Sequence, residues 1–274
     1  MSERPLTLMA VHAHPDDEAS STGGVLARYA AEGITTVVVT CTDGRCGDGP
    51  DGVKPGEPGH DPEAVVAIRR RELETSCATL KVSHLEMLGY HDSGMMGWDS
   101  NQAPRAFWAA PVAEAAEKLA ALIREYRPDV VVTYDENGGY GHPDHIQVHR
   151  VTMAAVALAD SPAKVYWSAL PQSAMRQVGE RMREMGIGLD GPDPADMPPM
   201  GWPDEEITAW VDVSAVLDQK FDALAAHASQ SDGAFFIGLG RETFAKVMGT
   251  ECYVRVKDTT GSPDREDDLF TGLR

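Results

Sequence analysis

The stretch LTLMAVHAHPDDE, residues 6–18, decides the fold expected for this chain. It begins with an apolar run, Leu6–His12, that is typical of a buried strand, and a cluster of histidine and acidic residues, His14–Glu18, follows almost at once. A second apolar run at Val130–Thr133 precedes a similar cluster, His142–His145. Metal-ligand side chains at the ends of two strands predict one metal site assembled from distant parts of the chain, with metal-assisted hydrolysis as its chemistry.

Strand-like and helix-like patterns alternate through the first two thirds of the sequence. The expected strands are Leu6–His12, Ile34–Thr40, His84–Leu88, Asp129–Tyr134 and Lys164–Ala169, and the expected helices are Gly23–Ala31, Glu63–Leu80, Ala109–Tyr126 and Asp144–Ala159. This alternation predicts an α/β fold with a Rossmann-like, mostly parallel sheet and helices on both faces. Such sheets bind ligands beyond the carboxyl ends of their strands, at the point where strand order reverses. In the common order the first and fourth strands flank that point, and those are the strands followed by the two clusters.

The alternating pattern weakens after Leu170, which divides the chain into two expected parts. Residues 1–170 are predicted to form the Rossmann-like catalytic core, and residues 171–274 a smaller C-terminal α+β part that completes the substrate cleft. In the second part we expect strands at Ile207–Val213 and Cys252–Val256 and a helix at Ala215–His227. Segments rich in Gly and Pro, Gly44–Gly59 and Gly186–Trp202, are expected loops, the second of them a possible lid.

Composition limits the partners and the location of the protein. The 274 residues contain 24 Lys and Arg against 43 Asp and Glu, a formal net charge of −19, which disfavours nucleic acid and anionic membranes as partners. No apolar stretch approaches the length of a bilayer span, and the N-terminus lacks the layout of a signal peptide. Four cysteines are too few for a disulfide framework. These features predict a cytoplasmic protein that acts on a small molecule; the oligomeric state stays open.

Three residues of the two clusters suit a catalytic metal ion. Hydrolytic zinc usually has three protein ligands and an open fourth position. His14 and Asp17 lie three residues apart as the chain leaves the first strand, so they can face one point, and His145 can supply the third ligand from the other strand end. Two histidines and one carboxylate fit Zn²⁺, and the same set also fits Fe²⁺.

The remaining residues of the clusters can then be given catalytic roles. Asp16 is a candidate for the base that takes a proton from the attacking water. His142, in its protonated form, is a candidate for stabilising the oxyanion or for protonating the leaving group, and Asp144 could hold the His142 ring. Tyr140 could donate its hydroxyl to the oxyanion, and the glycines at positions 138 and 139 would let its loop move over a substrate.

Alternative interpretations exist for each cluster taken alone. Asp16-Asp17-Glu18 is also a good helix start, and His142-Pro143-Asp144-His145 could be a turn followed by a helix N-cap. Their joint occurrence at matching strand ends favours the metal site. The sequence has no dinucleotide-binding glycine motif after the first strand, no Walker lysine motif and no Gly-x-Ser-x-Gly elbow. A non-catalytic sugar- or metal-binding protein descended from an enzyme is the remaining alternative of a different class.

The segments Ala13–Glu18 and Gly141–His145 together resemble the LmbE-like (PIG-L) family of metal-dependent de-N-acetylases. The likeness is strongest to its mycothiol-pathway branch, which acts on N-acetylglucosaminyl-inositol, and it covers most of the chain. Further matching segments are Val130–Asp135, Asn137–Tyr140, Asp92–Met95, Ala226–Gln230 and Asp267–Leu273. The sequence departs from the family pattern at Cys46–Asp61 and Gly186–Pro203, which would shape the mouth of the substrate site.

The resemblance implies a zinc-dependent hydrolase that removes the N-acetyl group of a 2-acetamido sugar conjugate. It implies His14, Asp17 and His145 as metal ligands, Asp16 as general base, His142 and Tyr140 as transition-state stabilisers, Asp144 as support for His142, and Arg69 and Asp92 as substrate-binding residues. Two other substrate classes share the same motifs. These are mycothiol S-conjugates, cleaved by a related amidase, and natural products that carry an amino sugar.

Overall fold

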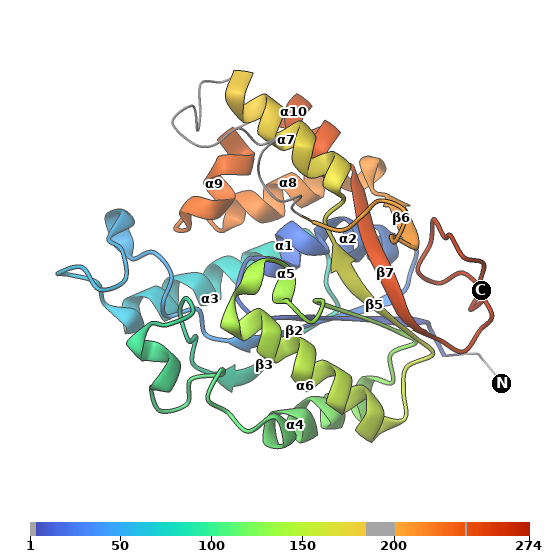
Figure 1. Cartoon of the computed structure of the whole chain (residues 1–274), viewed down its shortest axis with the longest axis horizontal. Coiled ribbons are helices and arrows are strands. Elements are labelled where there is room, and N and C mark those ends of the chain that lie inside the picture. Colours follow the sequence, from blue (N-terminus) through green and yellow to red (C-terminus); the bar gives the residue numbers. More distant parts are fainter. Residues whose placement is uncertain (1–3, 185–200, 239) are drawn as a thin grey trace.

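A central sheet organises the computed structural model, which describes residues 4–184, 201–238 and 240–274 (Figure 1). Within these residues the sheet has seven strands in the order β3-β2-β1-β4-β5-β7-β6. The strands are β1 (Thr7–His12), β2 (Thr35–Thr42), β3 (His84–Tyr90), β4 (Val130–Thr133), β5 (Lys164–Ala169), β6 (Ala209–Asp212) and β7 (Thr250–Asp258). The first five pair in parallel. This confirms the predicted α/β fold with a mostly parallel sheet.

The reversal of strand order falls between β1 and β4, as the alternating pattern predicts. The chain moves outward from β1 through β2 to β3 and then returns to place β4 on the other side of β1. Leu8, Met9 and Ala10 of β1 are in register with Val130, Val131 and Val132 of β4. The carboxyl ends of these two strands therefore lie side by side, where an open α/β sheet binds its ligands.

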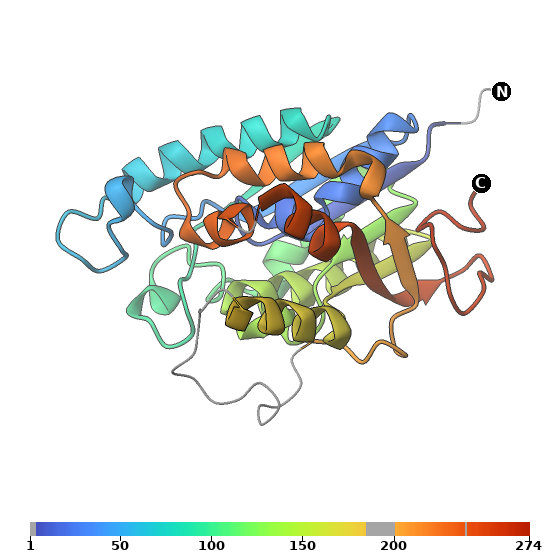
Figure 2. The same cartoon turned by 90° about the horizontal axis from the view of Figure 1, so that it is seen from above.

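Helices cover both faces of the sheet. They are α1 (Asp17–Ser21), α2 (Gly23–Ala31), α3 (Pro62–Thr79), α4 (Val112–Tyr126), α5 (Gly138–Gly141), α6 (Pro143–Ala159), α7 (Gln172–Glu184), α8 (Leu217–Ala226), α9 (Ser231–Gly238) and α10 (Gly240–Met248). Figure 1 shows α4 and α6 on one side of the sheet and α2 and α8 on the other. Figure 2 shows α3 and α8 running side by side, so the C-terminal half of the chain packs directly on the N-terminal half.

Strand β1 contributes to two hydrophobic cores because its side chains alternate between the two faces of the sheet. Leu8 and Ala10 pack in the core under α2, α3 and α8, and Met9 and Val11 pack in the core under α4 and α6. All four side chains are fully buried. A strand covered on both faces needs an unbroken apolar run, which explains the sequence that opens the chain.

The C-terminal part joins the same sheet. β7 pairs antiparallel with β5, and β6 pairs antiparallel with β7. The two strands and the helix expected in this part are present, whereas helices α7, α9 and α10 were not predicted. The expected loop Gly186–Trp202 lies mostly outside the described residues. At its described end, the backbone of Trp202 pairs with Leu170 and Gln172. The division of the chain at residue 170 stays a prediction.

A buried carboxylate, Glu251 at the start of β7, ties the two halves of the chain together. Its oxygens accept hydrogen bonds from the backbone N–H groups of Gly24 (2.7 Å) and Val25 (2.8 Å) in the first turn of α2. They also accept from Lys220 Nζ of α8 (2.7 Å) and from the hydroxyl of Tyr253 (2.9 Å). The carboxylate thus caps a helix of the core and neutralises a buried ammonium from the C-terminal part.

Replacement of Glu251 by Ala is expected to lower the free energy of unfolding by about 3–5 kcal/mol, because it leaves Lys220 buried without its partner. Chemical denaturation measures this loss. Glu74→Ala removes a carboxylate that pairs with Arg70 on the exposed face of α3 and should cost under about 0.5 kcal/mol. Similar losses in both variants would contradict the role given to Glu251.

Candidate metal centre

The two histidine clusters meet at the carboxyl ends of β1 and β4. His14 follows β1 and Asp17 begins α1, while His145 lies in the first turn of α6. His14 Nδ1 lies 3.3 Å from His145 Nε2 and 3.5 Å from Asp17 Oδ2, and Asp17 Oδ2 lies 3.6 Å from His145 Nε2. Ligand atoms about 2.0–2.1 Å from a tetrahedral ion stand about 3.3–3.4 Å apart. The three predicted ligand atoms therefore form a triangle of the size that a single tetrahedral ion needs.

Burial makes these ligands suitable for a cation. His14, Asp17 and His145 are each at most 9% exposed. Burial alone would raise the pKa of Asp17, but His145 and His14 outweigh that effect and hold the pKa well below its usual value. Burial lowers the pKa of His145 to about 4, even though Asp17 opposes the shift. Near neutral pH Asp17 is therefore a carboxylate and His145 a neutral imidazole, the protonation states in which these groups bind metals. Burial lowers the pKa of His14, but Asp92 and Asp144 outweigh that effect and hold it well above its usual value, so a cation bound at His14 would displace a proton.

The second nitrogen of His14 faces two buried carboxylates. His14 Nε2 lies 3.3 Å from Asp144 Oδ2 and 3.5 Å from Asp92 Oδ1. The backbone N–H of Ser93 also donates to Asp144 Oδ2, at 2.8 Å. A carboxylate on the outer nitrogen of a ligand histidine fixes the orientation and tautomer of that ring.

The structure thus places Asp144 and Asp92 differently from the sequence-based expectation. The carboxylate of Asp144 contacts His14, whereas the contact between Asp144 and His142 runs through the backbone N–H of Asp144. Asp92, expected to bind substrate, is 5% exposed and accepts from the backbone N–H groups of Cys46 and Gly94. The position of Asp92 could not be read from spacing, because it depends on how the loop after β3 folds against the end of β1, and that of Asp144 depends on how α6 packs beside β1.

Asp16 lies beside the ligands with its carboxylate turned another way. Its side chain is 27% exposed, and Arg69 Nη2 donates to Asp16 Oδ2 at 2.8 Å. Burial raises the pKa of Asp16 to about 6, although Arg69 opposes the rise. Its backbone φ of 119° is in the left-handed region, an uncommon conformation for a residue with a side chain. A carboxylate with a pKa near neutrality, within reach of solvent, can accept a proton.

Arg69 is almost fully buried and holds the segment that carries Asp16. Besides the carboxylate, its guanidinium donates to the carbonyl oxygens of Pro15 and Gly44. Gly44 packs so closely that a Cβ there would lie 2.6 Å from Arg69 Nη1. In this structure Arg69 contacts the chain itself, and its expected role in substrate binding stays a prediction.

His142 lies against the ligands as a neutral ring. Its ring centroid is 4.6 Å from that of His14 and 5.2 Å from that of His145. Burial lowers the pKa of His142 to about 3, and the neighbouring histidines add to the shift. The backbone N–H of Asp144 donates to His142 Nδ1 at 3.1 Å, so the ring hydrogen resides on Nε2. In this arrangement the neutral ring is favoured, with Nε2–H as a donor, and the catalytic role of His142 stays a prediction.

Tyr140 stands on a glycine loop at the rim of the centre. Its ring centroid is 5.1 Å from that of His145, and the side chain is 65% exposed. Asp135 Oδ1 accepts from the backbone N–H groups of Asn137 and Gly139, which fixes the loop, and Asp135 Oδ2 accepts from Trp202 Nε1 at 2.9 Å. A Cβ at Gly138, where φ is +63°, would lie 2.6 Å from that of His145, so this position needs glycine.

Sequence analysis missed two residues that support the centre. Glu18 was read only as part of a helix start, yet it is fully buried and bonds to His227 at the end of α8. Asp135 lies just beyond the expected strand Asp129–Tyr134, in a segment that resembles the family, and was given no role of its own. The one available signal for Glu18 and His227 was that both fall in segments that resemble the same family, Ala13–Glu18 and Ala226–Gln230.

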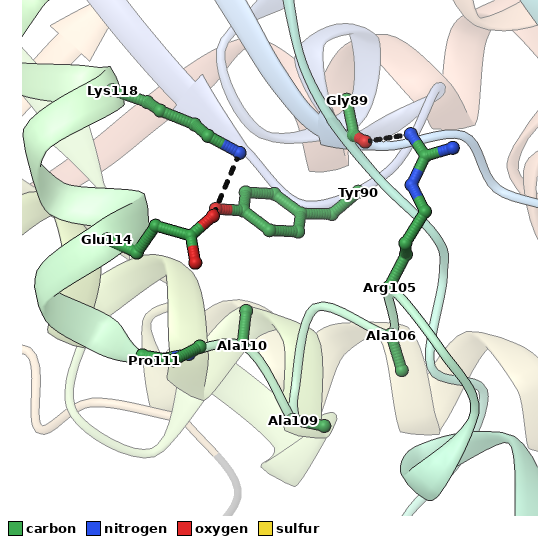
Figure 3. Close-up of a pocket in the computed structure, with 9 residues that line it drawn as sticks. All are labelled: Gly89, Tyr90, Arg105, Ala106, Ala109, Ala110, Pro111, Glu114 and Lys118. Atoms are coloured by element: carbon green, nitrogen blue, oxygen red, sulfur yellow. Dashed lines mark hydrogen bonds and ion pairs between the residues drawn. The ribbon is translucent and has the colours of Figure 1, made fainter.

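A separate pocket of about 400 Å³ lies between the end of β3 and the start of α4 (Figure 3). Figure 3 shows Lys118 and Glu114 turned toward the hydroxyl end of Tyr90, and Arg105 turned toward the carbonyl oxygen of Gly89. None of the predicted site residues lines this pocket. Its charged groups pair with one another or with the backbone, so it takes no part in the chemistry considered below.

The family model described as "PIG-L: GlcNAc-PI de-N-acetylase" matches residues 9–156, a range that contains both histidine clusters. The chain belongs to this family. This confirms the predicted family and the predicted class of enzyme, a hydrolase of amide bonds.

Relatives in the PIG-L family match over nearly the whole chain. One from Acidothermus cellulolyticus, named 1D-myo-inositol 2-acetamido-2-deoxy-alpha-D-glucopyranoside deacetylase, is 43% identical over 280 residues, covering 97% of this chain and 95% of the relative. A protein of the same name from Thermobifida fusca is 46% identical over 247 residues, covering 84% of each. The match therefore includes the C-terminal part as well as the sheet that carries the metal centre.

Solved structures share the fold at lower sequence identity. The N,N'-diacetylchitobiose deacetylase from Pyrococcus horikoshii is 20% identical with a TM-score of 0.59, covering 91% of this chain and 83% of that one. A deacetylase of teicoplanin biosynthesis is also 20% identical, with a TM-score of 0.57 and coverage of 92% and 100%. A 4-carboxy-2-hydroxymuconate hydratase has a TM-score of 0.59 at 17% identity, covering 94% and 99%. At these identities the likeness establishes the fold alone, so the argument for activity depends on the centre.

Proposed function

We propose that this protein is a zinc-dependent N-deacetylase of a 2-acetamido sugar conjugate, with 1D-myo-inositol 2-acetamido-2-deoxy-α-D-glucopyranoside as its substrate. The observation that carries the proposal is the triangle of His14 Nδ1, His145 Nε2 and Asp17 Oδ2, with sides of 3.3, 3.5 and 3.6 Å. The substrate is inferred from the names of relatives that are 43% and 46% identical.

The spacing of the three donor atoms favours zinc over iron. Two imidazoles and one carboxylate suit either ion, but an octahedral ion has 90° between neighbouring ligands and would draw these atoms closer together than a tetrahedral one. When bound, Zn²⁺ supplies Lewis acidity toward the amide carbonyl and toward the attacking water. Asp144 and Asp92 keep His14 oriented from behind, through Nε2.

Asp16 is proposed as the general base. It sits next to Asp17 in the sequence, but its carboxylate is held by Arg69. Because solvent reaches its side chain, it can accept a proton from the water that attacks the acetyl carbon and later return a proton to the leaving amine. Arg69 keeps the carboxylate ionised and oriented through the hydrogen bond from its Nη2.

His142 and Tyr140 are proposed to stabilise the oxyanion. With Nδ1 of His142 accepting a backbone hydrogen bond, its Nε2–H remains as a neutral donor next to the metal ligands. Tyr140 brings a hydroxyl to the same rim on a loop held by Asp135. Donors fixed before the reaction stabilise the developing charge without reorganisation, and each is worth about a hundred- to a thousandfold in kcat.

Release of a primary amine from the proposed substrate by zinc-loaded protein tests the proposal. Mycothiol S-conjugates and an N-acyl amino-sugar natural product serve as competing substrates in the same assay. We expect turnover of the inositol conjugate to exceed that of the other two. Equal or faster cleavage of an S-conjugate would contradict the substrate assignment while leaving the metal centre in place.

Activity is expected to fall as the pH drops through the pKa of Asp16, because a protonated carboxyl cannot accept a proton. Burial raises that pKa to about 6 and a bound cation would lower it, so the acid limb of kcat should lie at or below about pH 6. Arg69→Met removes an opposing positive charge and should move the limb upward by about one pH unit. Arg70→Met, whose guanidinium pairs with Glu74, should leave it in place. If the acid limb of kcat does not move in Arg69→Met, Asp16 is not the general base.

We also propose a cytoplasmic location and a small-molecule substrate, without nucleic-acid or membrane partners. The four cysteines, Cys41, Cys46, Cys77 and Cys252, are free thiols, which agrees with a reducing compartment. Among the described residues, no helix has the length and apolar character needed to cross a bilayer. The net charge of −19 makes binding to nucleic acid unfavourable.

A further inference from the structure

The backbone of Asp16 is held in a conformation that few residues with a side chain adopt. Its φ is 119° and its ψ is −27°, and it precedes α1 without a side-chain cap. Its N–H donates to Glu18 Oε2 at 3.0 Å, two residues along the chain. A conformation of this kind persists only where the surrounding structure fixes it, and the hydrogen bond to Glu18 is one contact that fixes it.

Glu18 is itself fixed by groups from two other helices. Its side chain is fully buried, and its second oxygen, Oε1, accepts from Ser76 Oγ of α3 at 2.5 Å and from His227 Nε2 at 2.8 Å. Burial would raise the pKa of Glu18, but His227 outweighs that effect and keeps it lowered. A carboxylate with three donors from separate elements has no freedom to turn, and it transmits its position to the N–H of Asp16.

His227 comes from the far end of the sequence and serves this contact. It is the residue that ends α8, and its ring is 1% exposed. Within the described part of the chain, its Nδ1 has no hydrogen-bond partner, so Nε2 makes the one hydrogen bond recorded for this ring. A buried histidine with one unpaired ring nitrogen lowers the stability of the fold. Stability alone therefore does not explain why this ring lies beside Glu18.

We propose that Glu18 and His227 form a positioning pair that holds the backbone of Asp16 and thereby aims its carboxylate at the attacking water. The inference rests on the role proposed for Asp16 above. Arg69 holds the carboxylate at the other end, through the contact with Oδ2. The base is thus fixed at both its main chain and its side chain. Neither member of the pair touches the substrate; they act through Asp16.

Through this pair, the packing of α8 on the core also contributes to catalysis. Helix α8 contacts α1, α2 and α3. His227, the residue that follows it, reaches Glu18 in the segment after β1. The C-terminal part therefore completes the active site from behind and not only at its mouth. Loss of this contact should misplace the base while leaving His14, Asp17 and His145 able to bind metal.

A double-mutant cycle tests the inference in the zinc-loaded, full-length protein. His227→Leu is made in the natural sequence and in Asp16→Asn, and kcat, KM, bound zinc and thermal unfolding are measured for each. In the natural sequence kcat should fall about ten- to a hundredfold, with KM and zinc content unchanged, because small misplacement of a catalytic group costs this much. In Asp16→Asn the same change should lower kcat less than about twofold, since residues that act as a unit are not additive.

Two further variants sharpen the result. His227→Gln retains an N–H that can reach Glu18 and should recover part of kcat. Ser229→Ala is the matched control, because it lies two residues further along the same loop and donates to Glu72 of α3 instead. Ser229→Ala should keep kcat within about twofold of the natural protein.

Several outcomes would overturn the positioning role. These are an unchanged kcat in His227→Leu, effects that multiply in the cycle, or loss of zinc from His227→Leu. If His227→Leu does not fold, Glu18→Gln carries the same cycle with Asp16→Asn and the same expectation that the effects do not multiply. Full activity in Asp16→Asn alone would instead refute the proposed base, so the two failures are distinguishable.

Discussion

Asp16→Asn is expected to lower kcat by about a hundred- to ten-thousandfold while the protein keeps its zinc. Asn retains an oxygen that can accept the hydrogen bond from Arg69 Nη2, so the change removes the ability to accept a proton and little else. The three metal ligands are untouched. Steady-state release of the amine, with zinc measured in the same preparation, separates loss of the base from loss of the ion.

Asp99→Asn is the control for this substitution. Asp99 is an exposed carboxylate at the start of a short 3₁₀ helix, Asp99–Gln102, and has no contact with the ligands. Its replacement should leave kcat within about twofold. If Asp16→Asn were as active as Asp99→Asn, the base would have to be another residue. If Asp16→Asn lost zinc, its carboxylate would belong to the metal coordination.

His145→Ala is expected to weaken zinc binding by more than about a hundredfold and to abolish activity at ordinary zinc concentrations. The substitution removes one corner of the ligand triangle, leaving His14 Nδ1 and Asp17 Oδ2 3.5 Å apart. It also leaves Asp17 with less positive charge nearby, so the pKa of Asp17 should rise from its depressed value. Titration with a competing chelator measures the affinity.

His149→Ala gives the matched comparison, because His149 lies one turn further along α6. Its Nδ1 lies 3.0 Å from the carbonyl oxygen of Tyr134, and its ring packs against Trp167. We expect zinc affinity close to that of the natural protein. Equal losses in the two variants would indicate that α6 as a whole, and not the imidazole of His145, holds the ion in place.

The parallel strands could be predicted because each is a short continuous segment of the sequence and is covered by helices on both faces. Leu6–His12 and Lys164–Ala169 are short runs dominated by apolar and β-branched residues, and β1 and β5 occupy nearly the same residues. The antiparallel addition of β7 and β6 was not predicted, because the alternating pattern that orders the parallel strands ends before them. Helix α7 was missed because its composition is strongly polar, although its few apolar residues recur at helical spacing.

The candidate centre was predictable to the extent that its residues are adjacent in sequence. The spacing of His14 and Asp17 and the position of His145 after a strand are enough to bring the three together. The contacts of Asp144 and Asp92 with His14 could not be foreseen, since they depend on how α6 packs beside β1 and on the path of the loop after β3. The pairing of Glu18 with His227 spans 209 residues, and no local pattern encodes it.

Anomalous scattering at the zinc edge, from crystals of the zinc-loaded protein, tests the central claim most directly. The account predicts one strong peak bonded to His14 Nδ1, His145 Nε2 and Asp17 Oδ2, at about 2.0–2.2 Å from each. His142 should lie outside the coordination, with its Nδ1 still on the backbone N–H of Asp144. His14, His142 and His145 are also close enough to hold an ion together. A peak bonded to those three, with Asp17 free, would contradict both the ligand set and the donor role of His142.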